Sequence, residues 1–230
     1  VLRAGYALLS IDYRLAPETQ LPEIITDVED AFSWLGKNAR RLKLDTERLG
    51  VAGGSAGGYL TLVCGYRVRP RPKVLIAFWG YGDLVGDWYS KPSKHARHNR
   101  IKPKRETAYK QVSGPPVSDA RLRAGRGGIF YVYCRQHGIW PHAVTGWDPH
   151  REAKKFFPYM PVQNVSKNFP PTMLIHGTKD TDVPYQQSVL MAQQFKQHSV
   201  AHKLITIKNG EHGLGGGDRA KINAAYRAVV

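Results

Sequence analysis

The chain has 230 residues, of which 42% are hydrophobic, enough for one sizeable core but too few for two comfortable domains. No apolar run approaches the roughly 20 residues that a membrane-spanning helix needs. Two cysteines, Cys64 and Cys134, are too few for a disulfide framework. The chain does not begin with Met, so we expect a piece of a longer gene product, compatible with a cytoplasmic or a secreted protein.

The first part of the chain predicts a strand followed by a helix. Residues 4–12 are apolar and contain β-favouring side chains, which predicts a buried strand. Apolar residues then recur at helical spacing over residues 24–35, with Pro22 close to the expected first turn. We expect this helix to end at Gly36 or in the basic run that follows it.

A second strand and helix flank a glycine-rich turn. Residues 49–52 predict a short strand and residues 57–67 a helix. Between them Gly53–Gly57 fits G-x-S-x-G, the sharp turn that presents a serine hydroxyl above a parallel sheet. Such a turn points the NH of Ala56 toward charge that develops at the Ser55 hydroxyl. A glycine turn without any chemistry is the alternative.

The alternation of elements continues and then stops. Residues 74–79 form a continuous apolar run of strand length, so strands and helices alternate up to this point. This order predicts an α/β protein with a mostly parallel sheet flanked by helices. Residues 81–157 lack the pattern and are rich in aromatic side chains. We interpret them as a cap-like insertion over the ligand-binding edge of the sheet, or else a peripheral subdomain with its own aromatic core.

Much of the positive charge lies within this insertion. The chain carries 34 Lys and Arg against 18 acidic residues, a formal charge of +16. Residues 91–126 hold eleven Lys and Arg but only two acids. A solvated face is favoured over a nucleic-acid or anionic surface, because no nucleic-acid-binding motif accompanies the charge. His95 and His98 lie in the same run, but two histidines make a poor metal site, and we expect no metal.

Regular order returns near the C-terminus. Residues 170–177 predict a strand that ends in a turn, followed by a helix over about residues 185–198. Residues 202–207 predict another strand, and a final helix is expected from about Asp218. We therefore divide a single domain of residues 1–230 into a core, about 1–80 and 158–230, and the insertion.

Three residues after predicted strands carry the chemistry that the serine needs. A serine nucleophile requires a histidine base, and that base requires a carboxylate to fix its tautomer. Ser55, Asp180 and His212 occur in the order that this architecture uses. Because the carboxyl ends of parallel strands share one edge, we expect the three side chains to converge there.

Two further acids lie next to these candidates. Asp182 is the rival acid, but Asp180 is preferred because it lies at the tip of the turn that leaves the strand, four residues after His176. Asp182 is expected to hydrogen-bond loop backbone. Glu211 adjoins His212, and we interpret it as a loop residue because neighbouring side chains usually diverge.

Four motifs together carry a resemblance to a known fold. They are Tyr13-Arg14-Leu15-Ala16-Pro17-Glu18, Gly53-Gly54-Ser55-Ala56-Gly57-Gly58, His176-Gly177-Thr178-Lys179-Asp180 with Val183-Pro184, and Gly210-Glu211-His212-Gly213. The chain resembles the α/β-hydrolase fold, and more narrowly the hormone-sensitive-lipase-like esterases and the bacterial feruloyl and acetyl xylan esterase-like group. The resemblance covers the two core segments well and the middle loosely. It implies a Ser55 nucleophile, an Asp180 acid, a His212 base and ester hydrolysis through an acyl-enzyme.

The chain departs from these families at its beginning. They carry a His-Gly-Gly-type loop upstream, whose backbone NH groups complete the oxyanion hole, and we expect this loop and the first strands of the sheet to be missing from this chain. Ala56 is therefore the one oxyanion donor that we can name. Loss of one such donor costs about 10²–10³ in rate. Gly54, Trp79 and Tyr81 are candidate substrate-binding residues.

The leading hypothesis is a serine esterase for short-acyl or aryl esters, such as acetyl or feruloyl esters of plant polysaccharide. The aromatic insertion motivates the carbohydrate suggestion, since sugar faces stack on Trp and Tyr. The substrate is then a small or polysaccharide-linked ester, with no cofactor and no nucleic-acid partner. A serine peptidase of the same fold and a non-catalytic binding protein that keeps the fold are the alternatives. The oligomeric state is left open.

Overall fold

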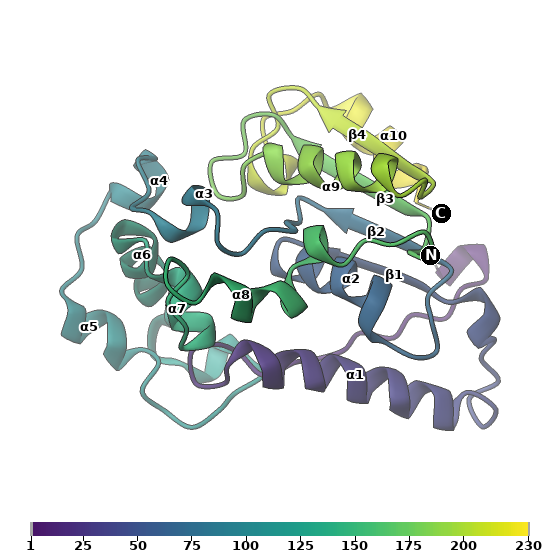
Figure 1. The fold of residues 1–230 in the computed structure, drawn as a ribbon, viewed down its shortest axis with the longest axis horizontal. Coiled ribbons are helices and arrows are strands. Elements are labelled where there is room, and N and C mark those ends of the chain that lie inside the picture. The colour runs from purple at the N-terminus through teal and green to yellow at the C-terminus, as the bar shows by residue number, and fades with distance from the viewer. Residues whose placement is uncertain (1, 230) are drawn as a thin grey trace. The chain divides into compact units, whose positions relative to one another are not determined.

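A parallel sheet of four strands forms the centre of the computed structural model, which describes residues 2–229. The strands lie side by side in chain order, as Figure 1 shows. They are β1 (Gly50–Gly54), β2 (Val74–Phe78), β3 (Thr172–Gly177) and β4 (His202–Ile207). All neighbouring pairs are parallel. The carboxyl ends of the four strands therefore meet at one edge of the sheet.

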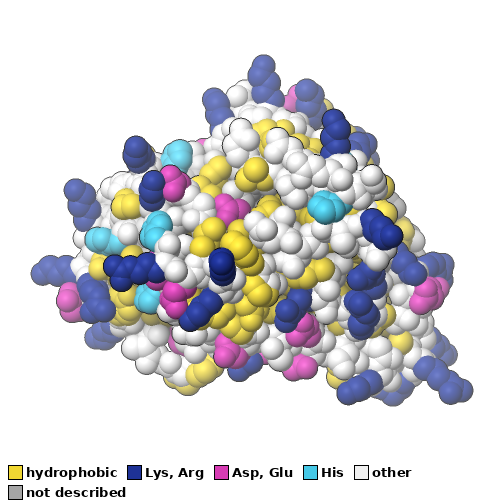
Figure 2. All heavy atoms as spheres, in the orientation of Figure 1, with side chains coloured by type: hydrophobic (Ala, Val, Ile, Leu, Met, Phe, Trp, Pro, Cys, Tyr) yellow, Lys and Arg dark blue, Asp and Glu magenta, His cyan; other side chains and the backbone are white. Residues whose placement is uncertain are grey.

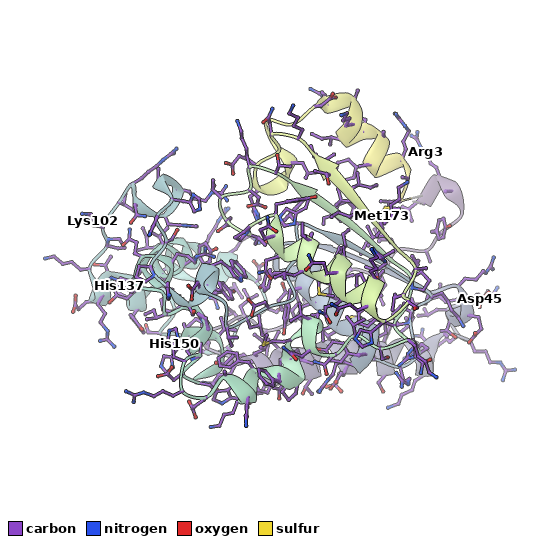
Figure 3. All side chains as sticks on the ribbon, turned by 45° about the horizontal axis from the view of Figure 1, so that its top comes forward. Arg3, Asp45, Lys102, His137, His150 and Met173 are labelled. Carbon is purple, nitrogen blue, oxygen red and sulfur yellow. The ribbon has the colours of Figure 1, made fainter. Side chains whose placement is uncertain are left out.

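The central strands β2 and β3 are largely apolar and buried, as expected for parallel strands covered on both faces, whereas β1 and β4 are more exposed. Leu75 and Leu174 are almost completely buried, and they alternate along β2 and β3 with residues of the opposite face. Side chains on the opposite face form a hydrophobic cluster. Met173 of β3, labelled in Figure 3, is partly buried and packs against this cluster. Its buried members are Ile76, Ile175, Ile207, Leu214 and Ala225.

The long helices lie where the sequence predicts them. Helix α1 spans Leu21–Asn38, α2 spans Ala56–Arg67, α9 spans Gln186–Gln197 and α10 spans Arg219–Arg227. Helix α2 follows β1 directly and packs against β1 and β2, whereas α9 and α10 both contact β4. The side chain of Asp218 caps α10 by accepting a hydrogen bond from the Lys221 NH.

The chain divides into two compact units. The sheet unit contains Glu29–Asp83 and the chain from Met160 onward, with the N-terminal segment up to Ser10. The helical unit contains Ile11–Val28 and Leu84–Tyr159. Its short helices are α3 (Asp87–Ser90), α4 (Ala96–Asn99), α5 (Arg105–Lys110), α6 (Gly128–His137), α7 (Trp140–Thr145) and α8 (Ala153–Phe156). The division into one domain with an insertion at residues 81–157 stays a prediction.

Short 3₁₀ helices complete the elements. They are η1 (Leu2–Ala4), η2 (Thr46–Arg48), η3 (Ala120–Leu122), η4 (Ala124–Gly127), η5 (Phe157–Tyr159), η6 (Pro161–Gln163) and η7 (His212–Leu214).

The helical unit has an aromatic core of its own. Phe130 and Cys134 of α6 are buried, and Trp140 packs against them. The Trp140 ring also meets Tyr131 at a centroid distance of 5.0 Å. The rings of Phe130, Tyr131 and Trp140 thus pack on one another within the helical unit, as the alternative of a subdomain with its own aromatic core describes.

A buried ion pair fixes the start of the helical unit. The Arg123 guanidinium donates to both carboxylate oxygens of Glu18 and, at 2.7 Å, to the carbonyl of Ala16. Exposed fractions are 10% for the Arg123 side chain and 3% for Glu18. Nearby, Arg14 pairs with Asp27 of α1 at 2.6 Å. Arg14 and Glu18, both from the motif at residues 13–18, therefore form ion pairs that stabilise the helical unit.

The strand predicted over residues 4–12 is absent, and that prediction is wrong. The segment contains the end of η1 and otherwise no regular element, and its apolar side chains face solvent. Exposed fractions reach 52% for Tyr6, 70% for Leu8 and 48% for Leu9. A strand requires a neighbour that accepts its ladder hydrogen bonds, and among residues 2–229 β1 pairs with β2 alone. An apolar sequence does not reveal whether that neighbour is available.

The surface carries the basic charge in scattered form. Lys and Arg side chains are spread over the visible face in Figure 2 and interspersed with acidic ones. Lys102, labelled in Figure 3, is an exposed member of the basic segment at residues 91–126.

Both cysteines are buried free thiols, and burial raises the pKa of each to about 12. None of the helices described is both long and apolar enough to cross a membrane.

Candidate active site

Ser55 lies in the sharp turn between β1 and α2. Its φ of 56° and ψ of −120° are unusual for a residue with a side chain, so the surrounding chain must hold it there. Gly53 explains part of the G-x-S-x-G spacing. A Cβ on Gly53 would come within 2.4 Å of the Gly57 carbonyl oxygen, so a side chain at this position would push α2 away from β1.

His212 lies in the loop after β4 and faces the serine. Its Nε2 is 3.0 Å from Ser55 Oγ, and its Nδ1 is 2.8 Å from Asp180 Oδ2. A carboxylate accepts, so Nδ1 carries the proton of the neutral ring and Nε2 accepts from the serine hydroxyl; this tautomer is assigned from the partners. The structure brings together the three side chains that the sequence singled out.

Asp180 lies after β3, where four donors surround its carboxylate. Oδ1 accepts from the backbone NH groups of Asp182 and Val183, both at 2.9 Å. Oδ2 is shared by His212 Nδ1 and His176 Nε2, the latter at 3.2 Å. Burial of the side chain would raise the pKa of the Asp180 carboxyl. The hydrogen bonds from His176 and His212 outweigh this and hold the pKa well below its usual range.

The rival acid takes a different position. Asp182 Oδ2 lies 3.8 Å from His212 Nε2, the nitrogen that faces the serine, and only Asp180 is hydrogen-bonded to Nδ1. The carboxylate that can orient the imidazole is therefore that of Asp180.

The contact that His176 makes with Asp180 was not predicted. The ring is fully buried at the end of β3. Its Nε2 lies 2.9 Å from the Val183 carbonyl, and its Nδ1 lies 2.7 Å from Ser188 Oγ. Because a carbonyl only accepts, the proton is on Nε2, where it also faces Asp180. The available signal was the position of His176 at the strand end, four residues before Asp180.

The other predicted site residues take different places around this group. Ala56 is the first residue of α2, where backbone NH groups have no partner inside the helix. Trp79 follows β2 with a φ of 36°, and its indole contacts the Cα side of Gly54, where a Cβ would come within 3.1 Å. The indole meets the His212 ring edge-on at 6.2 Å between centroids. Tyr81 is buried and stacks on Tyr59 at 5.0 Å.

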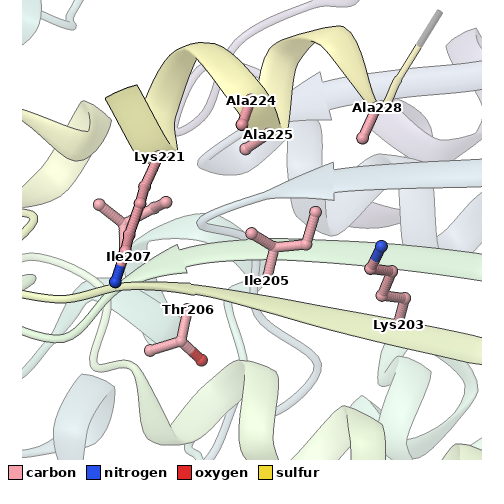
Figure 4. Close-up of a pocket in the computed structure, with 8 residues that line it drawn as sticks. All are labelled: Lys203, Ile205, Thr206, Ile207, Lys221, Ala224, Ala225 and Ala228. Atoms are coloured by element: carbon pink, nitrogen blue, oxygen red, sulfur yellow. The ribbon is translucent and has the colours of Figure 1, made fainter. Parts of the chain in front are cut away.

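A cavity lies elsewhere in the sheet unit, between β4 and α10 (Figure 4). Its volume is about 270 Å³, and apolar side chains such as Ile205 and Ala225 line it between Lys203 and Lys221. None of Ser55, Asp180 and His212 lines this cavity. Within residues 2–229, no group of three or more His, Cys, Asp or Glu is arranged to hold a metal ion.

The parallel sheet, with a serine at one strand-to-helix turn and an acid and a histidine after later strands, is the arrangement of the α/β-hydrolases. Solved structures agree with this fold. A truncated form of a carbohydrate esterase from gut microbiota superposes with a TM-score of 0.69 at 22% identity, covering 99% of this chain and 74% of that one.

The chain belongs to the prolyl oligopeptidase family, whose model matches residues 111–229, more than half of the chain. Residues 1–80 match the BD-FAE family model.

Curated relatives that match most of this chain include esterases and non-reducing polyketide synthases. Esterase LipC of Mycobacterium tuberculosis is 25% identical over 98% of the chain, and an ethyl acetate hydrolase of Pseudomonas putida is 26% identical over 91%. The chain spans 49% of the first relative and 56% of the second, about half of their length.

Proposed function

We propose that this chain is a carboxylic ester hydrolase that works through an acyl-enzyme. The observation that carries the proposal is the continuous hydrogen-bonded path from Ser55 Oγ through the His212 ring to Asp180 Oδ2, with distances of 3.0 and 2.8 Å. A path of this kind lowers the cost of removing the serine proton as the oxygen attacks a carbonyl carbon.

The residues then have defined roles. Ser55 Oγ forms a bond to the acyl carbon while His212 Nε2 takes the serine proton, and Asp180 stabilises the imidazolium that results. The Ala56 NH donates to the oxyanion of the tetrahedral intermediate. His212 returns the proton to the departing alcohol as the ester bond breaks. His212 then removes a proton from water as the water oxygen attacks the acyl carbon, and returns this proton to Ser55 Oγ as the acyl–serine bond breaks and the carboxylic acid leaves.

The proposed substrates are short-acyl or aryl esters, either small molecules or acetyl and feruloyl esters of plant polysaccharide. The ethyl acetate hydrolase among the relatives supports the short acyl group. The indole of Trp79 beside Gly54 and His212 supports a small space at the nucleophile. Release of acetate or ferulate from xylan, measured beside hydrolysis of simple esters, tests the polysaccharide part.

The first experiment compares the initial rate of p-nitrophenyl acetate hydrolysis by the chain and by Ser55→Ala. We expect the initial rate of the variant to be at least about 10³-fold lower than that of the parent, because the nucleophile is gone. Equal rates for the two proteins would contradict the proposal.

A serine peptidase is the second candidate, favoured by the family model over residues 111–229. An aminoacyl p-nitroanilide distinguishes the two functions, because its amide bond is harder to break than an ester of the same acyl group. Ser55-dependent release of nitroaniline at rates near the ester rate would favour the peptidase.

A further inference from the structure

The side chain of Glu211 connects the loops that carry the acid and the base. Its Oε2 atom accepts hydrogen bonds from three donors on these loops. Thr181 contributes its backbone NH at 3.3 Å and its hydroxyl at 3.0 Å. The backbone NH of His212 contributes the third, also at 3.3 Å. Thr181 follows Asp180 directly in the chain, so a single oxygen contacts the neighbour of the acid and the backbone of the base.

Backbone contacts alone bring the two loops together only at their starts. The NH of Lys179 donates to the Gly210 carbonyl at 2.9 Å, and the NH of Thr178 donates to the Ile207 carbonyl at 3.0 Å. Both contacts precede Asp180 and His212 in their loops. Glu211 adds the contact at the level of the reacting side chains, across 30 positions of sequence.

We propose that Glu211 is a positioning residue that sets the separation of Asp180 and His212. The role rests on the proposed ester hydrolysis, in which Asp180 must hold the His212 ring while the ring reaches Ser55. Both distances of the path depend on how far the acid loop lies from the base loop. Glu211 itself does not contact the reacting atoms, so it acts through these two residues.

Removal of the Glu211 carboxylate should reduce turnover and leave substrate binding almost unchanged. A displacement of about 1 Å in a catalytic group can cost about 10² in rate. Because the backbone contacts remain, we expect Glu211→Ala to lower kcat about 10- to 100-fold with KM within about twofold.

Conservative variants separate geometry from charge. One oxygen makes all three contacts, so the amide oxygen of Glu211→Gln can replace it, and we expect kcat within about threefold of the parent. Thr181→Val loses the hydroxyl contact, whereas Thr181→Ser keeps it. We expect Thr181→Val to lose less than Glu211→Ala, and the double variant to lose less than the product of the single losses, because the two residues share one interaction.

The experiment measures kcat and KM for p-nitrophenyl acetate, and the acid limb of the kcat/KM pH profile, for the parent, these variants and Ser55→Ala. Glu106→Ala is the matched control, because Glu106 is an exposed carboxylate on α5. Thermal midpoints identify any variant that fails to fold. A kcat for Glu211→Ala within twofold of the parent, with Ser55→Ala inactive, overturns the proposal. So does a Glu211→Gln variant that loses as much as Glu211→Ala and shifts the acid limb, since charge would then be responsible.

A readout without turnover keeps the test independent of the proposed function. The His212 Nδ1 proton, hydrogen-bonded to Asp180, should give a downfield NMR resonance in the parent and in Glu211→Gln. We expect Glu211→Ala to broaden or shift this resonance. An unchanged resonance counts against the positioning role of Glu211. Failure of the proposed function appears separately, as a parent no faster than Ser55→Ala.

Discussion

Buried charge has different roles in the two units. In the helical unit, the Glu18 carboxylate and the Arg123 guanidinium satisfy each other almost completely out of water. In the sheet unit, the Asp180 side chain is equally inaccessible, but its side-chain partners are two histidine rings, and one of these leads to Ser55. A guanidinium keeps its proton at any ordinary pH, whereas an imidazole can take one up and return it. The first arrangement therefore stabilises structure, and the second can move a proton.

Loss of the Asp180 charge should have the largest effect on activity. Asp180→Asn removes the acceptor that fixes the His212 tautomer, and we expect kcat to fall about 10⁴-fold, with much less effect on folding. Asp182→Asn is the matched comparison and should lose far less, because its carboxylate does not contact Nδ1. Steady-state kinetics on p-nitrophenyl acetate measures both. Similar losses in the two variants would mean that the acid is wrongly assigned.

Loss of the Glu18 charge should affect stability instead. Glu18→Ala leaves the Arg123 guanidinium buried with only the Ala16 carbonyl as an acceptor, and we expect a loss of about 3 kcal/mol in the free energy of unfolding. Urea denaturation measures it. Glu47→Ala is the control, since the pair of Glu47 with Lys73 is exposed and should contribute under about 1 kcal/mol. If the two variants lose equal stability, the buried pair does not have this role.

The fold of the sheet unit could be predicted because its signals are local. Strands β2 and β3 contain short apolar runs, β1 leads directly into the glycine-rich turn, and the four long helices have clear periodicity or flanking turns. The convergence of Ser55, Asp180 and His212 then follows from topology, because parallel strands bring their carboxyl ends to one edge. Their juxtaposition was predicted correctly, and their catalytic role is a proposal.

The failures involve partners that a local pattern does not reveal. Residues 4–12 have the composition of a strand, but no ladder forms with β1. Glu211 lies in a glycine-flanked loop and nothing local marks it as special. Its contact with Thr181 depends on how two loops that are distant in the sequence meet. Apart from α6, the short helices of the helical unit span only four to six residues, too few to show helical periodicity. The packing of α6 depends on the aromatic core around Phe130.

A smaller effect on stability should appear in acid. Burial opposes ionisation of Asp180, but the hydrogen bonds of His176 and His212 prevail and place its folded pKa below the value of 3.8 for an ordinary aspartate. A carboxyl group with a lowered pKa stabilises the fold above the unfolded pKa, and this contribution is lost as the pH falls toward the folded pKa. The free energy of unfolding should therefore decrease below about pH 4 by an amount that Asp180→Asn lacks. Urea denaturation of both proteins between pH 3 and 7 measures the difference, in which the contributions of other carboxyl groups cancel. A constant difference across this range would show that the two histidines do not favour the charged form of Asp180.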